Sequence, residues 1–333
     1  MVEWRDLRDN HPAMAALAIL MPVYHDSASA AAVIAQVRLA LGGSGDVSVV
    51  VVDDGSIPAI TCADLAQRGA GGAVSVVTLR RNVGHQRAIA IGLAFIAERL
   101  SVEAVLVMDA DGEDRVEDVP RLLDAWRRTG GTRIVFASRT RRAESLAFRV
   151  LYHVYRGLHR LLTGIPVRFG NFSVVPAPLL ARLVYSSELW NHYAAAVLKT
   201  RLPYSAVPTT RGRRLQGDSR MGLVALVVHG LSALSVFSDT LGVRLLVSSV
   251  MGFVLLAMTA AVLAAWQWFG IIHVSPIAMF LGGFVLLVAL QIATACALLA
   301  LVVLGRRTGT DFVPARDYRL FIQFVSECRD APR

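Results

Sequence analysis

The charge-free stretch from Leu245 to Gly305 constrains this chain more than any other feature, because it contains no Asp, Glu, Lys or Arg. Two apolar segments within it are Leu245–Trp268 and Ile277–Leu304. Each is long enough to cross a hydrocarbon core of about 30 Å as a helix rising about 1.5 Å per residue. Gly270–Pro276, between them, carries turn residues. We predict a hairpin of two membrane-spanning helices; the alternative is a buried helix pair in a soluble protein.

Basic residues flank this hairpin on both sides. Arg211, Arg213, Arg214, Arg220 and Arg244 precede it, and Arg306 and Arg307 follow it. Since the connecting loop has no charge, the positive-inside rule predicts a multi-pass protein of the cell inner (plasma) membrane with both termini in the cytoplasm. The net charge of +9 suits membrane lipid and phosphorylated substrates. Nucleic acid is not an expected partner, because the sequence has no helix-turn-helix, zinc or aromatic-interleaved basic motif.

Before the hairpin, short apolar runs alternate with helical patterns. The runs are Ala16–Val23, Val47–Val52, Val74–Leu79, Ala104–Met108 and Ile134–Ala137, and the helical patterns are Ala28–Leu41 and Gln86–Ala97. This alternation predicts an α/β fold, a mostly parallel sheet with helices on both faces. Every run ends in a polar or charged cluster, and the carboxyl ends of parallel strands share one edge. We therefore expect a ligand site at that edge.

The strongest cluster follows the fourth run, in the sequence VLVMDADGED. Asp109, Asp111 and Glu113 alternate along the chain, and on an extended segment such side chains point to the same side. Clustered carboxylates suit Mg²⁺ or Mn²⁺, ions that commonly hold phosphate oxygens. The alternative is a solvated acidic turn, which is the commoner explanation of an isolated Asp-x-Asp.

The neighbouring clusters suit other parts of a nucleotide-linked ligand. Acids after the second run can accept hydrogen bonds from a ribose or base, a glycine after the third permits close approach, and arginines can pair with phosphate. These residues are Asp53, Asp54, Arg81, Asn82, Gly84, Arg139 and Arg141. The absence of Gly-x-Gly-x-x-Gly after the first run and of a P-loop argues against a dehydrogenase and a P-loop NTPase.

In this order and spacing, the series PVYHD, VVDDGS, RNVG and MDADGED resembles glycosyltransferase family 2, and most closely its polyprenyl-phosphate branch. The resemblance covers about residues 16–240 and extends to the hairpin. It implies a GT-A (Rossmann-like) domain, a UDP- or GDP-linked nucleotide-sugar donor, a polyprenyl phosphate acceptor and Mg²⁺ or Mn²⁺. It also implies inversion at the anomeric carbon and a homo-oligomer such as a tetramer.

Together, the residues and the resemblance assign four sets of roles. The nucleotide-sugar set is Pro22, Tyr24, Asp26, Asp53, Asp54, Arg81, Asn82, Gly84 and Asp109; the metal set is Asp109, Asp111 and Glu113; the catalytic set is Asp111, Arg139, Arg214 and Arg220; the acceptor set is Arg139, Arg141, Asn171, Ser219 and Arg220. Several positions depart from the family pattern: Asp26 is a shortened acid, and Arg220 keeps the charge while replacing a lysine. Glu113 replaces a glutamine, Arg115 and Val116 replace prolines, and Ser173 stands where an arginine is usual.

We predict four parts of the chain: a cytoplasmic GT-A domain (residues 1–222), an interfacial amphipathic helix (223–242), two transmembrane helices (243–305, about 245–268 and 277–304) and a cytoplasmic tail (306–333). A second amphipathic stretch, Phe148–Leu162, either lies at the membrane interface or covers the sheet. Cys62, Cys296 and Cys328 are odd in number and scattered, so neither a disulfide framework nor a zinc site is indicated.

Two other functions stay open. A family-2 enzyme acting on a sugar hydroxyl would need a general base, for which Glu188 is the only nearby candidate. A non-catalytic nucleotide-sugar-binding membrane protein would explain the replacements after Gly112, but intact Asp109 and Asp111 argue against it. The isolated His85, His192 and His229 are expected to be surface or packing residues rather than ligands.

Overall fold

The computed structural model describes residues 14–42, 47–66, 73–139, 157, 163–164, 169–212, 214–215, 223–305 and 312–328. The chain divides into two compact units. The first, the α/β unit, comprises Met1–Arg156, Pro166–Val236 and Phe312–Arg333. The second, the hairpin unit, comprises Gly157–Ile165 and Phe237–Asp311. Apart from Gly157, the amphipathic stretch predicted over Phe148–Leu162 lies outside the described residues.

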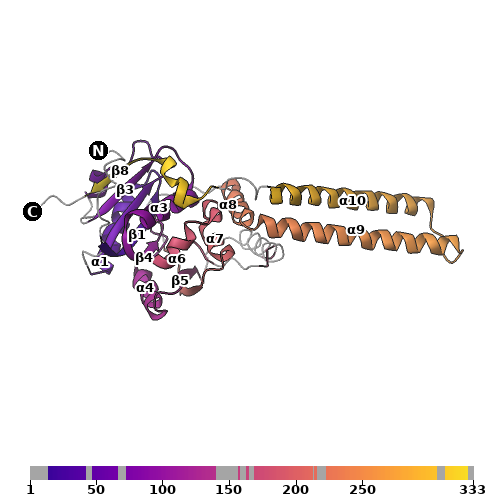
Figure 1. Ribbon diagram of the computed structural model, residues 1–333, viewed down its shortest axis with the longest axis horizontal. Helices are drawn as coiled ribbons and strands as arrows, with labels where there is room; N and C mark the ends of the chain where they lie inside the picture. Colours follow the sequence, from indigo (N-terminus) through magenta and orange to yellow (C-terminus); the bar gives the residue numbers. More distant parts are fainter. Residues whose placement is uncertain are drawn as a thin grey trace, which may run out of the picture. The chain divides into compact units, whose positions relative to one another are not determined.

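The α/β unit is built on one mixed sheet (Figure 1). Its strands are β1 (Met14–Val23), β2 (Val47–Asp53), β3 (Val74–Leu79), β4 (Ser101–Val107), β5 (Ile134–Arg139), β6 (Ser173–Pro176), β7 (Tyr204–Thr209) and β8 (Ile322–Cys328). Its helices are α1 (Ser27–Ala40), α2 (Cys62–Ala66), α3 (His85–Arg99), α4 (Val119–Arg128), α6 (Ala177–Leu183), α7 (Tyr193–Lys199), α8 (Leu223–Ser235) and α11 (Pro314–Asp317). Short 3₁₀ helices are η2 (Val116–Asp118), η3 (Ser187–Trp190) and η5 (Tyr318–Phe321).

The strand order is β7-β5-β6-β4-β1-β2-β3-β8. β1 pairs in parallel with β2 and β4, and β2 pairs in parallel with β3. Because β6 is antiparallel to both β4 and β5, these two strands run in the same direction. β7 is parallel to β5. The five predicted strands and β7 therefore end at one edge, which we call the carboxyl edge.

Apolar side chains cover both faces of this sheet. Along β1, Ala18 and Leu20 join one buried cluster, whereas Leu17, Ile19 and Met21 join the other. The first cluster includes side chains of α3, α6 and α7, and the second includes side chains of α1 and α4. A strand buried on both faces is apolar at nearly every position, which is why continuous apolar runs predicted these strands.

The hairpin unit contains two long apolar helices, α9 (Ser238–Trp268) and α10 (Pro276–Gly305), which lie side by side (Figure 1). Both are long and apolar enough to cross a membrane. Gly242 of α9 packs near Ala300 of α10, since a Cβ on the glycine would lie 3.6 Å from the Ala300 Cα. The predicted helical hairpin is thus confirmed as a structural element.

The C-terminal segment is not the tail that the sequence predicted. Instead, β8 pairs antiparallel with β3 and becomes an edge strand of the sheet. Tyr318 of η5 is fully buried, and its hydroxyl donates to Glu98 of α3 at 2.6 Å. The α/β unit therefore includes residues on both sides of the hairpin.

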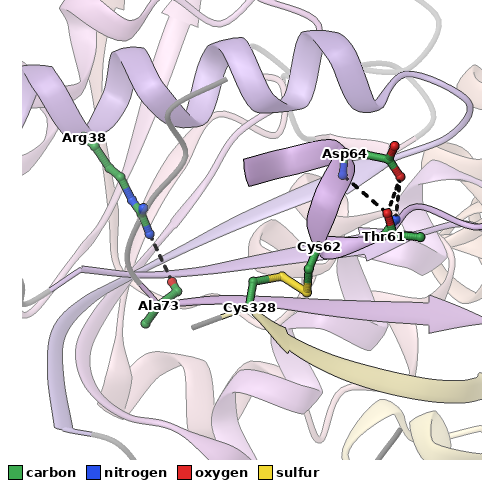
Figure 2. The surroundings of a disulfide bond; sticks show 6 residues. All are labelled: Arg38, Thr61, Cys62, Asp64, Ala73 and Cys328. Carbon is green, nitrogen blue, oxygen red and sulfur yellow. Dashed lines mark hydrogen bonds between the residues drawn. A yellow bond between two sulfur atoms is a disulfide. The ribbon is translucent and has the colours of Figure 1, made fainter. Parts of the chain in front are cut away.

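A disulfide joins Cys62 of α2 to Cys328 of β8 (Figure 2), contrary to the prediction from cysteine spacing. Their Cα atoms are 5.3 Å apart although 266 residues separate them in the sequence. β8 brings Cys328 to the start of α2, so the pair is created by the fold and leaves no signal in the spacing. Cys296 of α10 is a free cysteine.

Candidate functional site

The turn after β4, residues Asp109–Asp114, forms the centre of the candidate site; we call it the acid turn. Gly112 has a φ of 85°, so the chain turns here and is not the extended segment on which the same-side prediction depended. The Glu113 N–H donates to Asp111 Oδ1 at 2.9 Å, and the Asp109 N–H donates to Asp114 Oδ2 at 2.9 Å. Asp114 is thereby buried and shapes the turn.

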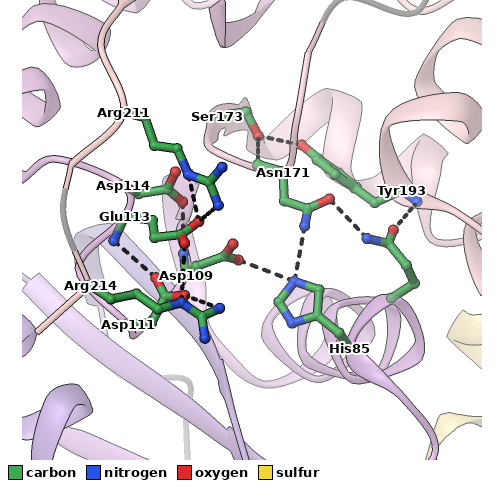
Figure 3. Close-up of polar contacts among 11 residues, drawn as sticks. His85, Asp109, Asp111, Glu113, Asp114, Asn171, Ser173, Tyr193, Arg211 and Arg214 are labelled. Carbon is green, nitrogen blue, oxygen red and sulfur yellow. Dashed lines mark hydrogen bonds and ion pairs between the residues drawn. The ribbon is translucent and has the colours of Figure 1, made fainter. Parts of the chain in front are cut away.

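Two arginines lie against the acid turn (Figure 3). They belong to the segment after β7, residues 210–212 and 214–215, which we call the arginine loop. Arg211 Nη2 lies 2.5 Å from Glu113 Oε2. Arg214 Nη2 lies 2.9 Å from Asp111 Oδ2, and its Nε lies 3.1 Å from Glu113 Oε1. Arginine is suited to phosphate as well as carboxylate, so the pairing puts phosphate-binding groups beside the acids.

A chain of polar contacts connects the first acid to α7 (Figure 3). The Tyr193 N–H donates to Gln86 Oε1 at 2.8 Å, and Gln86 Nε2 donates to Asn171 Oδ1 at 3.1 Å. Asn171 Nδ2 lies 2.9 Å from His85 Nε2, which lies 3.1 Å from Asp109 Oδ1. Asn171, a predicted acceptor residue, is therefore at the carboxyl edge.

Ser173 explains one departure from the family pattern. Its side chain is fully buried, and its hydroxyl donates to the Asn171 carbonyl at 2.9 Å and lies 2.6 Å from the Tyr193 hydroxyl. A serine fits this buried position, whereas the long charged side chain of an arginine would require solvent or a counterion.

The charges of the site shift its pKa values. Burial lowers the pKa of His85, but the nearby carboxylates, that of Asp109 first, outweigh this and the net shift is upward. The His85 side chain is 44% exposed, which limits the burial penalty. Burial raises the pKa of Asp111, and the charges of Asp109 and Glu113 add to this effect while Arg214 opposes it. The excess of negative charge favours binding of a cation.

Asp53 and Asp54, at the end of β2, are buried and fix the neighbouring loops. Asp53 accepts hydrogen bonds from the N–H groups of Ser56 and Ile60, both at 3.0 Å. Asp54 accepts from the N–H groups of Val83 at 2.7 Å and Gly84 at 3.0 Å. Burial raises the pKa of Asp54 against the effect of these bonds. Contact of Asp53 and Asp54 with a ribose or base stays a prediction.

The other predicted donor residues surround the same edge. Pro22 lies in β1, and Tyr24, just after it, is 47% exposed. Asp26 caps α1 by accepting a hydrogen bond from the Ser29 N–H at 3.2 Å. Exposed Arg81 and Asn82 precede Gly84, which has a φ of 94° and is the N-cap residue of α3. Their part in binding the donor stays a prediction.

Four predicted residues are not placed by the structure in full. Arg141, Ser219 and Arg220 lie outside the described residues. Arg139 ends β5 and its backbone pairs with Thr209 at the carboxyl edge. Within the described ranges, no group of three or more His, Cys, Asp or Glu side chains is arranged to hold a metal ion. Metal binding by Asp109, Asp111 and Glu113 stays a prediction.

Sequence reasoning missed two residues of this site. His85, which the sequence predicts to be a surface or packing residue, is partly exposed, and its ring also lies against Asp109. The sequence does place it directly after RNVG, at the start of the predicted helix. Arg211 was interpreted only as a charge flanking the hairpin. Because β7 was not predicted, no signal placed Arg211 at the carboxyl edge.

Comparison with known proteins agrees with this architecture. Residues 18–182 match the family model Glycosyl transferase family 2. An uncharacterised glycosyltransferase of Bacillus subtilis is 25% identical over 170 residues, 50% of each chain. An undecaprenyl-phosphate 4-deoxy-4-formamido-L-arabinose transferase of Edwardsiella ictaluri is 28% identical over 223 residues, 63% of this chain. The chain spans 50% and 64% of the length of these two relatives.

A solved structure shares the fold. The glucosyl-3-phosphoglycerate synthase of Mycobacterium tuberculosis, in complex with Mg²⁺ and uridine-diphosphate, superposes with a TM-score of 0.51 at 18% identity. The match covers 68% of this chain and 80% of that chain, and it confirms the predicted GT-A-like fold. The family model, the order of the motifs and their position at one edge of the sheet show that this chain belongs to glycosyltransferase family 2.

Proposed function

We propose that this protein transfers a sugar from a UDP- or GDP-linked donor to the phosphate of a polyprenyl phosphate, with inversion at the anomeric carbon. The observation that carries the proposal is the pairing of the acid turn with Arg211 and Arg214 at the carboxyl edge. Such a pairing offers a cation site and phosphate-binding guanidinium groups together. The relative from Edwardsiella ictaluri, named as a transferase onto undecaprenyl phosphate, supports the choice of acceptor.

On the donor side, Asp109 and Asp111 would hold Mg²⁺ or Mn²⁺ together with diphosphate oxygens. These two carboxylates fit such an ion, since Mg²⁺ in proteins is commonly held by one or two carboxylates plus substrate phosphates. When bound, the ion neutralises charge on the leaving nucleoside diphosphate. The remaining nucleotide-sugar contacts are assigned to Pro22, Tyr24, Asp26, Asp53, Asp54, Arg81, Asn82 and Gly84.

On the acceptor side, the phosphate is itself the nucleophile. A phosphate monoester has a second pKa near 6, so it is largely a dianion at neutral pH and needs no general base. Bringing this dianion to a diphosphate requires cations that reduce the repulsion between them. We assign this task to Arg139, Arg141, Arg214 and Arg220, with Asn171 and Ser219 as polar contacts. Catalysis is then largely positioning and charge stabilisation.

The membrane arrangement completes the proposal. α9 and α10 would span the inner membrane, residues 223–242 would lie at its interface, and the α/β unit and both termini would be cytoplasmic. The length and apolar composition of the two helices support this arrangement. We further propose that the chain forms a homo-oligomer.

The test is transfer of labelled sugar from a panel of UDP- and GDP-sugars into organic-extractable lipid by the purified full chain. The reaction contains polyprenyl phosphate and Mg²⁺ or Mn²⁺, and Asp111→Asn is the control. We expect metal-dependent lipid product that the variant does not form. No lipid product, with sugar transfer that instead depends on a sugar acceptor, would favour a hydroxyl acceptor. Nucleotide binding without any transfer would indicate the non-catalytic alternative.

A further inference from the structure

We propose that Glu113 is a positioning residue that holds Arg211 and Arg214 toward the diphosphate of the donor, and that it is not a ligand of the metal. The inference rests on the proposed function in one respect, namely that a nucleoside diphosphate is the ligand of this site. It changes the role that the sequence and the family resemblance gave to Glu113. It also gives Arg211, which no motif marked, a place in donor binding.

Both carboxylate oxygens of Glu113 are occupied by guanidinium groups (Figure 3). Oε2 accepts from Arg211 Nε at 3.0 Å and Nη2 at 2.5 Å, and Oε1 accepts from Arg214 Nε at 3.1 Å. The Glu113 side chain is only 12% exposed. A divalent cation on this carboxylate would have to approach two guanidinium cations at close range, which like-charge repulsion opposes.

The backbone holds the arginine loop in place without help from the Glu113 side chain. The Gly212 N–H donates to the Glu113 carbonyl at 2.8 Å, and the Leu215 N–H donates to the Asp111 carbonyl at 3.0 Å. A Cβ on Gly212 would lie 2.5 Å from the Gly112 carbonyl oxygen, so the two backbones are in close contact. The side chain of Glu113 is therefore left to orient the guanidinium groups.

The same geometry separates Glu113 from the two aspartates of the acid turn. Arg214 contacts Asp111 through Nη2 and Glu113 through Nε, so the two carboxylates share this guanidinium group. His85 Nε2 lies 3.1 Å from Asp109 Oδ1. Arg214 contacts Asp111, whereas both Arg211 and Arg214 contact Glu113. We therefore assign the metal to Asp109 and Asp111, and we assign to Glu113 the arginines that would bind the phosphate oxygens.

The test separates metal affinity from nucleotide affinity in the full chain in detergent. Mn²⁺ binding is measured by electron paramagnetic resonance without nucleotide, and UDP and GDP binding by calorimetry with saturating Mn²⁺. In Glu113→Gln we expect nucleotide affinity to fall by about tenfold or more, as for loss of a buried charge partner. Mn²⁺ affinity should stay within about threefold of wild type, whereas Asp111→Asn should lower it by about tenfold or more.

Three further variants complete the test. Glu103→Gln removes the same charge from an exposed glutamate of β4, the strand before the acid turn, and should change neither affinity. The double variant Arg211→Ala with Glu113→Gln should lose less nucleotide-binding free energy than the sum of the losses in the two single variants, because the two residues act as one pair. Glu113→Asp keeps the charge but shortens the side chain, so it should also weaken nucleotide binding while Mn²⁺ binding is retained.

Loss of Mn²⁺ binding in Glu113→Gln comparable to that in Asp111→Asn would make Glu113 a metal ligand and overturn the proposal. Unchanged affinity for both Mn²⁺ and nucleotide would overturn it as well. Failure of the wild-type protein to bind either nucleotide would refute the proposed function together with this inference. Failure of polyprenyl phosphate to accept sugar, with nucleotide binding intact, would refute the proposed acceptor alone.

Discussion

Replacing Gly212 with alanine should separate the arginine loop from the acid turn. The added Cβ would lie 2.5 Å from the carbonyl oxygen of Gly112 and 3.3 Å from that of Glu113, and backbone atoms cannot rotate away as a side chain can. Ordinary van der Waals separation requires the loop to move by about 1 Å. Because the Gly212 N–H donates to Glu113 at 2.8 Å, a displacement of this size breaks the bond.

The magnitude follows from what this displacement removes. Two backbone hydrogen bonds join the loop to the turn, and each contributes about 0.5–1.5 kcal/mol. The ion pairs add little, because the Arg211 and Arg214 side chains are 39% and 31% exposed. A total of about 1–3 kcal/mol reduces the population of the closed loop by about 5- to 150-fold. Nucleotide affinity should fall within that range if the closed loop is the binding form.

The assay is calorimetric binding of UDP and GDP with saturating Mn²⁺, together with thermal unfolding. Gly170→Ala is the matched control, since a Cβ there meets no atom within 4 Å. Nucleotide affinity of Gly212→Ala within about twofold of the control would refute the reasoning, because it would mean that the close approach does not position the arginines.

Three more outcomes are expected. In the oxidised protein, Cys62→Ser should lower the free energy of unfolding, measured in urea, by up to about 5 kcal/mol, because it opens a loop with a sequence separation of 266. Dithiothreitol should cause the same loss in the wild type and no further loss in the variant. The pKa of His85 in metal-free protein, measured by NMR, should lie above 6.5 and should fall in Asp109→Asn. Because the pKa is higher in the folded than in the unfolded state, the stability that protonated His85 contributes is complete below the unfolded-state pKa. It is lost as the pH rises through the folded-state pKa. Gly92→Ala should cost about 1–3 kcal/mol in thermal unfolding, because its Cβ would overlap a leucine side chain of β1.

The sequence predicted those strands that are buried on both faces, because such strands are apolar at nearly every position. β1 to β5 are buried and read as continuous apolar runs. β6 has only four residues, and β7 is an edge strand that contains Pro208, a residue that strands tolerate mainly at edges. β8 pairs with β3 across most of the chain, so its role depends on a partner that no local pattern can identify.

The sequence predicted that the site lies at the carboxyl edge of the sheet, but it did not predict the contacts among the site residues. Strand polarity fixes the edge at which Asp53, Asp109 and Gly84 gather, and strand polarity could be inferred from the alternation of strands and helices. The conformation of the acid turn depends on the positive φ of Gly112, which removes the alternation of an extended chain. The contact of Arg211 with Glu113 joins residues 98 positions apart, and only the parallel pairing of β5 with β7 brings them to the same edge.

The return of the chain to the sheet bears on membrane topology independently of the flanking arginines. The chain leaves the α/β unit after α8, passes through two long apolar helices, and rejoins the same unit at Phe312. β8 then pairs with β3, so the residues before and after the hairpin belong to one folded body and must share one side of any membrane that the hairpin crosses. An even number of spanning helices satisfies this requirement, and an odd number would not. The proposed cytoplasmic location predicts that Cys62 and Cys328 are thiols in the cell, because a reducing cytoplasm opens such pairs, whereas recovery of the disulfide from cells would place the unit in an oxidising compartment.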